Sequence, residues 1–125
     1  MPTSPKKIVV AEDESILLRA LNIELLAAGY EVLSATTGKA ALEVIKKERP
    51  ALVLLDILMP EIDGFGVLEN LQHDSELKKI PVIILSNLGQ DEEVKKGLSL
   101  GAKDYYVKAS TDLETITQKI KELLG

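Results

Sequence analysis

Residues 52–60 read LVLLDILMP, so an unbroken run of aliphatic side chains ends at a single carboxylate, Asp56. A short apolar run of this kind is typical of a strand that is buried on both faces of a parallel sheet. In open parallel sheets the ligand crevice lies beyond the carboxyl ends of the strands. The sequence around Asp56 therefore predicts a carboxylate that faces a binding site rather than the core.

Four other apolar runs alternate with longer amphipathic segments, which is the pattern of repeated strand-helix units around a parallel sheet. The first helical pattern ends at Gly29, and the second runs from a cap at Thr36-Thr37 to about Glu48. The predicted strands are about 6–11, 31–35, 52–56, 81–86 and 104–108, and the later helices are about 64–74, 91–100 and 111–124. A capping box at Thr111–Glu114 is expected to start the last helix. Short right-handed connections then predict a doubly wound α/β domain, flavodoxin-like (βα)5, with a parallel five-stranded sheet of order 2-1-3-4-5.

The composition narrows the class of protein. A chain of 125 residues fits one domain, which we expect to span residues 1–125 with a mobile lead at residues 1–5. The balance of 20 acidic against 15 basic side chains gives a net charge of -5, which disfavours direct binding to nucleic acid. Cysteine is absent, so no disulfide framework is present, and the expected location is the cytoplasm. A membrane span is not expected, because no apolar run approaches about 18 residues.

Acidic side chains follow two of the predicted strands. Glu12 and Asp13 follow the first strand and Asp56 follows the third, and these strands are neighbours in the order 2-1-3-4-5. Clustered carboxylates repel one another unless a cation joins them, and hard oxygen ligands favour Mg²⁺. We predict that Asp13 and Asp56 bind Mg²⁺ directly, that Glu12 acts through water, and that the Leu58 carbonyl is a further ligand.

Two other predicted strands end in groups that complement an anion. Ser86 follows the fourth strand and Lys108 ends the fifth. A carboxylate such as Asp56 can accept a phosphoryl group as a nucleophile, and the transfer requires the phosphoryl oxygens to be neutralised. Mg²⁺, the Lys108 ammonium group, and the Ser86 hydroxyl with backbone amides are predicted to meet one oxygen each.

This combination of residues resembles the receiver domain of two-component response regulators over essentially the whole chain. The resemblance implies that Asp56 accepts a phosphoryl group from a sensor histidine kinase or a phosphotransfer protein. It also implies that Ser86 and Tyr105 report the phosphoryl group, and that the face of the fourth helix, fifth strand and fifth helix changes shape for a downstream effector. Such a domain promotes its own phosphorylation and dephosphorylation, and is not a turnover enzyme. The matching elements are Glu12-Asp13, Asp56 with Pro60 and Gly64, Ser86, and Tyr105 with Lys108.

The chain departs from this family at two places. Ala109 follows Lys108 where the family usually has proline, and we expect the Lys108–Ala109 bond to be trans because a non-proline cis bond costs about 2.5–4 kcal/mol. In receivers the residues two beyond the acceptor and two beyond the hydroxyl flank the path of a hydrolytic water. Here these are Leu58 and Leu88, which cannot orient a water by hydrogen bonding. A slow loss of the phosphoryl group is therefore expected.

Four other functions fit the sequence less well. A phosphatase or mutase with an aspartyl nucleophile usually needs a second acid two residues later, where this chain has Leu58. A nucleotide hydrolase needs a glycine-rich loop with lysine, and a dinucleotide or flavin module needs glycines after the first strand, where Glu12-Asp13 stands. The remaining alternative is a pseudo-receiver, an interaction module that is never phosphorylated. Its usual mark is loss of the acceptor, the acidic pair or the lysine, and this chain keeps all of them.

Overall fold

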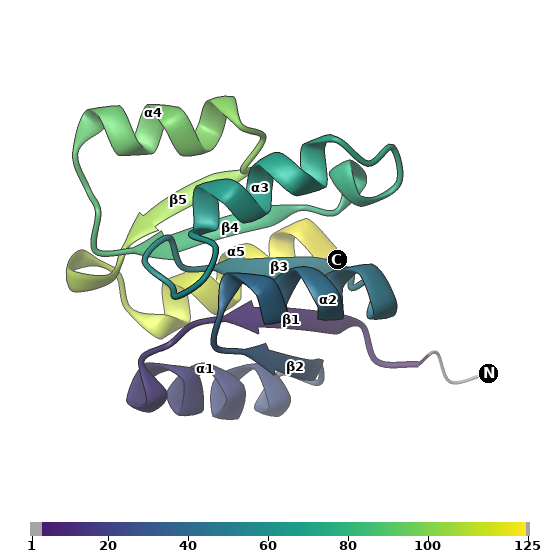
Figure 1. Cartoon of the computed structure of the whole chain (residues 1–125). Helices are drawn as coiled ribbons and strands as arrows, with labels where there is room; N and C mark the ends of the chain where they lie inside the picture. The colour runs from purple at the N-terminus through teal and green to yellow at the C-terminus, as the bar shows by residue number, and fades with distance from the viewer. Residues whose placement is uncertain (1–3, 125) are drawn as a thin grey trace.

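The computed structural model describes residues 4–124 and shows one twisted parallel sheet between two layers of helices (Figure 1). Ser4 and Pro5, part of the expected mobile lead, are exposed and lack secondary structure, and residues 1–3 of that lead lie outside the described residues. No helix in the described part is long and apolar enough to cross a membrane. The strands are β1 (Lys7–Ala11), β2 (Glu31–Ala35), β3 (Leu52–Leu55), β4 (Val82–Ser86) and β5 (Asp104–Val107), and the helices are α1 (Ser15–Ala27), α2 (Gly38–Glu48), α3 (Gly64–Gln72), α4 (Asp91–Ser99) and α5 (Leu113–Leu124).

The sheet has the order β2-β1-β3-β4-β5 with every pair parallel, which confirms the predicted doubly wound topology. β1 lies between β2 and β3, and Ala11 pairs with Leu55 at the carboxyl ends of their strands. The residues that follow these two strands therefore emerge side by side. This is the switch point at which ligands bind in folds of this kind.

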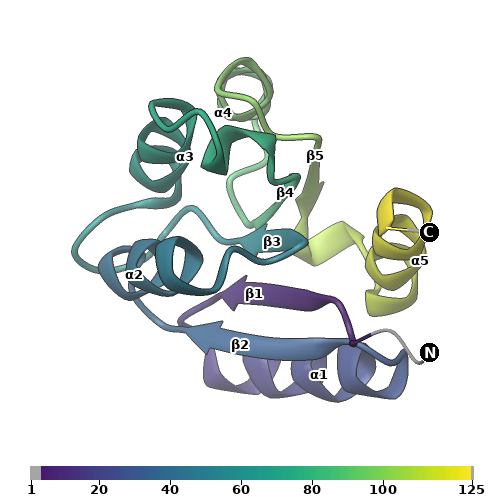
Figure 2. The same cartoon turned by 90° about the vertical axis from the view of Figure 1, so that its right-hand side faces the viewer.

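Both faces of the sheet are buried, which explains the unbroken apolar runs. Figure 2 shows α2, α3 and α4 over one face, and α1 and α5 over the other. Because successive strand residues point to opposite faces, Val9 and Val53 pack in the core with α2 and α3, whereas Ile8 and Leu52 pack in the core with α1 and α5. The strands at the centre of the fold are thus held from both sides.

Most of the predicted helix boundaries agree with the structure. Thr37 caps α2 by accepting a hydrogen bond from the Ala40 N–H at 3.0 Å. Gly29 follows the end of α1 with a φ of 95°, which a residue with a side chain rarely adopts. Two short 3₁₀ turns, η1 (Leu77–Lys79) and η2 (Lys108–Ser110), were not predicted.

The predicted capping box at Thr111–Glu114 is wrong. The side chain of Asp112 caps α5 instead, because its Oδ1 accepts a hydrogen bond from the Thr115 N–H at 2.8 Å. The turn η2 occupies residues 108–110 and leaves Thr111 in an extended conformation, so the helix begins later, at Leu113. Asp and Thr are both good caps, and the position of the preceding turn decides which of them takes the role.

Candidate functional site

Asp56 lies directly after β3 and is only 3% exposed. Its N–H donates to the Ala11 carbonyl at 2.9 Å, which continues the β1–β3 pairing by one residue. One carboxylate oxygen, Oδ1, accepts a hydrogen bond from the Ile57 N–H at 2.7 Å. The backbone therefore fixes the orientation of the carboxylate and leaves Oδ2 for another partner.

Two glycines hold the loop between β3 and α3 against the rest of the fold. A Cβ at Gly64 would lie 2.3 Å from the carbonyl oxygen of Asp56, and a Cβ at Gly38 would lie 1.8 Å from the carbonyl oxygen of Ile62. These neighbours are backbone atoms, so a side chain at either position would displace the loop itself. Gly64 also donates its N–H to the Ile57 carbonyl at 2.8 Å. Because Gly38 and Gly64 have no side chains, the loop can pack closely at both positions, and this packing positions Asp56.

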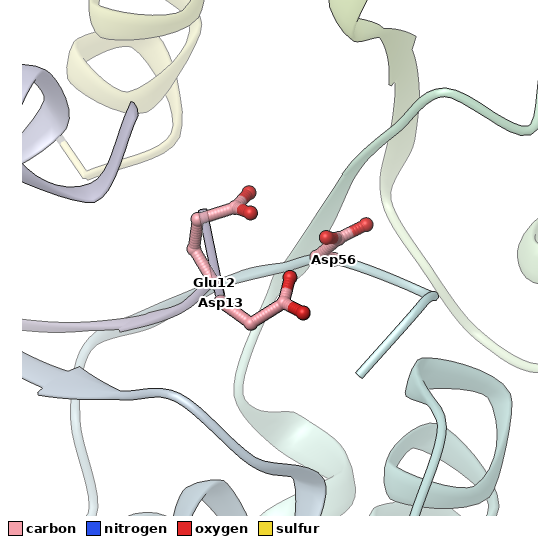
Figure 3. A group of neighbouring side chains, drawn as sticks. All are labelled: Glu12, Asp13 and Asp56. Carbon is pink, nitrogen blue, oxygen red and sulfur yellow. The ribbon is translucent and has the colours of Figure 1, made fainter. Parts of the chain in front are cut away.

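Glu12, Asp13 and Asp56 form an acidic cluster at the ends of β1 and β3, as Figure 3 shows. One carboxylate oxygen from each residue lies within 4.8 Å of the other two. Glu12 and Asp56 are buried, whereas Asp13 is exposed and lines the pocket above the cluster. Three carboxylates at this spacing fit a hard divalent cation such as Mg²⁺, which takes few protein ligands and keeps several waters. The role of each residue, including the Leu58 carbonyl, remains a prediction.

The Lys108 ammonium group lies over this cluster. Its Nζ is 3.0 Å from Asp56 Oδ2, 3.0 Å from Glu12 Oε1 and 2.9 Å from Glu14 Oε2. Burial lowers the pKa of Lys108, but the hydrogen bonds to Glu14, Glu12 and Asp56 outweigh it and raise the pKa above its usual value. The Lys108–Ala109 bond is trans, as expected, and every peptide bond between residues 4 and 124 is also trans. A proline after the lysine is therefore not needed to bring its side chain to Asp56.

Glu12 has an unusual environment for a carboxylate. Burial raises its pKa to about 7, although the Glu14 N–H and the Lys108 ammonium group both favour the charged form. Desolvation disfavours a charge more strongly than one shared ammonium group can offset. Burial thus weakens the preference of Glu12 for its charged form, which a further positive charge nearby would restore.

Ser86 and Tyr105 lie on either side of one short loop. The buried Ser86 hydroxyl accepts a hydrogen bond from the Leu88 N–H at 3.3 Å, and the Tyr105 hydroxyl donates to the Leu88 carbonyl. Burial raises the pKa of Tyr105, whose side chain is only 9% exposed. Gly97 of α4 leaves room for the ring, because a Cβ there would lie 3.0 Å from Tyr105 Cδ2. The tyrosine ring is thus turned inward in this structure.

A pocket of about 210 Å³ opens above the cluster. Leu58 is exposed and lines it, whereas Leu88 packs against the core and is not part of the lining. Larger hollows lie beside Tyr106, beside Ile16 and beside Thr37, but none of them gathers buried charges, so the carboxylate pocket is the candidate site. Its lining side chains are Asp13, Glu14, Asp56, Leu58, Asn87 and Lys108.

Sequence reasoning missed two residues of this pocket, Glu14 and Asn87. Both follow a residue that was singled out, and the signal for Glu14 was the third consecutive acid after the first strand. Its contact with Lys108 joins residues that are 94 positions apart, so only the fold reveals it.

A five-stranded doubly wound domain with an acidic cluster, a lysine and a hydroxyl at its strand ends is a receiver domain. Residues 8–121 match the family model described as response regulator receiver domain, and the chain belongs to this family. The chain is 40% identical over 124 residues to a probable transcriptional regulator, ycf27, from Pyropia yezoensis, covering 99% of this chain and 49% of that protein. It is 35% identical over 121 residues to the alkaline phosphatase synthesis transcriptional regulatory protein PhoP of Bacillus subtilis, covering 95% of this chain and 48% of that protein. The chain thus spans about half the length of these relatives.

Solved structures agree with this assignment. A putative response regulator from Chloroflexus aurantiacus superimposes with a TM-score of 0.88 at 28% identity, covering 96% of this chain and 98% of that one. The BeF3-activated N-terminal receiver domain of Klebsiella pneumoniae RstA superimposes with a TM-score of 0.83 at 30% identity, covering 94% and 97%. A Mn(2+)-bound form of response regulator Rcp1 superimposes with a TM-score of 0.82 at 28% identity, covering 94% and 93%.

Proposed function

We propose that this chain is a phosphoacceptor that takes a phosphoryl group onto Asp56 from a sensor histidine kinase or a phosphotransfer protein in a Mg²⁺-dependent reaction. The observation that carries the proposal is the contact of Asp56 Oδ2 with the Lys108 ammonium group at 3.0 Å, beside two further carboxylates. The similar receiver of RstA is described as BeF3-activated and the similar regulator Rcp1 as Mn(2+)-bound. These descriptions support the phosphoacceptor and the divalent cation of the proposal.

The transfer uses groups that are already in position. A carboxylate oxygen of Asp56 bonds to phosphorus while the bond from phosphorus to the donor nitrogen breaks, and the imidazole leaves with the electron pair. Lys108 offers N–H donors to the developing charge, and the backbone of the β3–α3 loop keeps the acceptor oriented. Mg²⁺, when bound by Glu12, Asp13 and Asp56, would supply the further positive charge that phosphoryl transfer requires.

The pseudo-receiver alternative lacks support, because the acceptor, the acidic pair and the lysine are all present and lie together at one site. As part of this proposal, the domain is not a turnover enzyme and acts in the cytoplasm. Its output is a change in the α4-β5-α5 face that alters binding of an effector protein. With a net charge of -5, direct contact of this domain with nucleic acid is not part of the proposal.

The donor protein needs a surface next to the pocket. Ile16 at the start of α1 is 86% exposed, and it lines an apolar hollow together with Glu14, which also lines the Asp56 pocket. An exposed apolar side chain beside the reactive group suits the docking of a partner protein. Ile16→Glu is therefore expected to slow transfer from a cognate kinase while leaving phosphorylation by acetyl phosphate unchanged.

The direct test is Asp56→Asn. Because an amide cannot form an acyl phosphate, the variant should take up no phosphoryl group from acetyl phosphate in Mg²⁺, as measured by intact-protein mass. Asp91→Asn, an exposed aspartate in the first turn of α4, is the matched control and should be labelled like wild type. Labelling of Asp56→Asn at the wild-type level would refute the proposed function.

A Mg²⁺ titration of the unmodified protein tests the metal separately. Asp13→Asn is expected to weaken Mg²⁺ binding, because it removes one of the few protein ligands that this ion takes. Asp63→Asn changes an aspartate that caps α3 outside the cluster, and should bind Mg²⁺ normally. An unchanged Mg²⁺ affinity in Asp13→Asn would exclude this residue as a ligand.

A further inference from the structure

Glu14 is held at the edge of the pocket by its own backbone. Its N–H donates to Glu12 Oε2 at 3.0 Å, and its carbonyl accepts the Leu18 N–H at 2.9 Å at the start of α1. Thr37 occupies the same position in α2, where its side chain caps the helix. The side chain of Glu14 makes no such cap, and turns instead to Lys108.

Lys108 has no free N–H donor in this arrangement. An ammonium group carries three N–H donors, and Lys108 meets three carboxylates, those of Glu12, Glu14 and Asp56, at 2.9–3.0 Å. The Glu12 and Asp56 side chains are almost fully buried, whereas the Glu14 side chain is 55% exposed. An incoming phosphoryl oxygen needs a donor from the same ammonium group while that group still holds the Asp56 carboxylate, so one of the three contacts has to give way.

Of the three carboxylates, Glu14 is the one that can be released at low cost. Its side chain can turn into water, whereas the Glu12 and Asp56 side chains are almost fully buried and would lose a partner that water cannot replace. Its removal does not free Lys108 from the pocket, because the two buried carboxylates still hold the ammonium group. The contact with Glu14 is therefore not required to place the lysine at Asp56.

We propose that Glu14 is a positioning residue that restrains phosphorylation by occupying one donor of Lys108 until the phosphoryl group arrives. This inference rests on the proposed function and adds a regulation of the same site. The count of charges agrees with this role. Mg²⁺ and Lys108 together would carry three positive charges, which would balance the carboxylates of Glu12, Asp13 and Asp56. The Glu14 carboxylate is then a negative charge in excess. It lies at the pocket lining, where an anionic phosphoryl donor enters.

Two substitutions separate the hold on Lys108 from the charge of Glu14. Glu14→Gln keeps the length of the side chain and removes its charge, whereas Glu14→Asp keeps the charge and draws the carboxylate away from Lys108. In Mg²⁺, Asp56 bonds to the phosphorus of acetyl phosphate and acetate leaves with the electron pair. Because an exposed ion pair contributes up to about 1 kcal/mol, both variants are expected to raise the maximum rate about two- to fivefold, with little change in the acetyl phosphate concentration at half-maximal rate.

A matched control and a second measurement accompany the rates. Glu24→Gln removes an exposed charge of α1 that lies outside the pocket lining, and should leave the rate at the wild-type value. In the unmodified protein without Mg²⁺, the Lys108 Nζ protons should exchange faster with solvent in both Glu14 variants, as measured by nitrogen-15 NMR. A purely structural effect of Glu14 would change the melting temperature and not this exchange.

The outcomes distinguish the inference from the proposed function. If both Glu14 variants react at or below the wild-type rate and Asp56→Asn is unlabelled, Glu14 does not restrain phosphorylation. The proposed function is unaffected by that result. An increase in Glu14→Gln alone assigns the effect to charge and overturns the hold on Lys108. Labelling of Asp56→Asn at the wild-type level instead refutes the proposed function itself.

Discussion

Gly97 of α4 gives a sharp test of how the buried tyrosine is packed. In Gly97→Ala the new Cβ would lie 2.6 Å from Ile84 Cδ1 and 3.0 Å from Tyr105 Cδ2, both closer than normal contact. The Ile84 side chain has to shift, but it is fully buried and has little room, whereas Tyr105 lies on the edge strand β5 and is 9% exposed. We therefore expect the ring to be displaced, and its hydrogen bond to the Leu88 carbonyl to be lost.

The change in the free energy of unfolding in Gly97→Ala follows from two opposing effects. Replacing a glycine inside a helix by alanine stabilises it by about 1 kcal/mol, whereas overpacking a filled core costs about 1–3 kcal/mol. The net change is a destabilisation of about 0–2 kcal/mol, which urea unfolding measures. The displaced ring should appear as changed NMR signals of Tyr105, assigned with Tyr105→Phe.

The control is Glu92→Ala, which places alanine at an exposed position of the same helix and should leave the Tyr105 signals unchanged. If Gly97→Ala were about 1 kcal/mol more stable than wild type, with unchanged Tyr105 signals, helix propensity alone would act. The close packing of Tyr105 against α4 would then be wrong.

Three further predictions concern the site. If the effector binds the α4-β5-α5 face, Tyr105→Ala should change effector affinity, measured by calorimetry, more than the phosphorylation rate; a change in rate alone would contradict this. Leu58→Asn combined with Leu88→Glu should hasten loss of the phosphoryl group by admitting and orienting a water. A wild-type phosphoprotein that decays within seconds in Mg²⁺ would refute the expected slow hydrolysis. In the Mg²⁺-free protein, the folded-state pKa of Glu12 is about 7 against an ordinary value of 4.5, so the folded state binds more protons between these values. The contribution of Glu12 to the free energy of unfolding should therefore fall as the pH rises from about 4.5 through 7, and Glu12→Gln should remove this slope in chelator-treated protein.

The sequence was sufficient for the sheet and its order because its signals were local. The unbroken apolar runs of β1, β3 and β4 required burial on both faces, and this left little choice beyond a parallel sheet covered by helices. The topological switch point then placed Glu12 and Asp13 beside Asp56, and the structure confirms that neighbourhood.

Other features depend on contacts that no local pattern encodes. The start of α5 at Leu113 depends on the 3₁₀ turn that follows Lys108, so a plausible capping box at Thr111 was not used. Met59 resembled its neighbour Leu58 in sequence, yet Met59 packs in the core while Leu58 is exposed at the pocket. In a loop without helical or strand periodicity, the direction of each side chain is set by packing against the rest of the fold.

The electrostatics of the pocket explain why a small, rigid domain keeps so many unfavourable charges. Glu12, Glu14 and Asp56 share the Lys108 ammonium group, with the Asp13 carboxylate beside them, and burial raises the pKa of Glu12. Perturbed groups of this kind cluster at functional sites, where a local electrostatic cost is tolerated. The central strands are packed on both faces, and this burial supplies stability that offsets the cost. The repulsion between these carboxylates is thus the same interaction that would give a divalent cation its affinity for the strand ends.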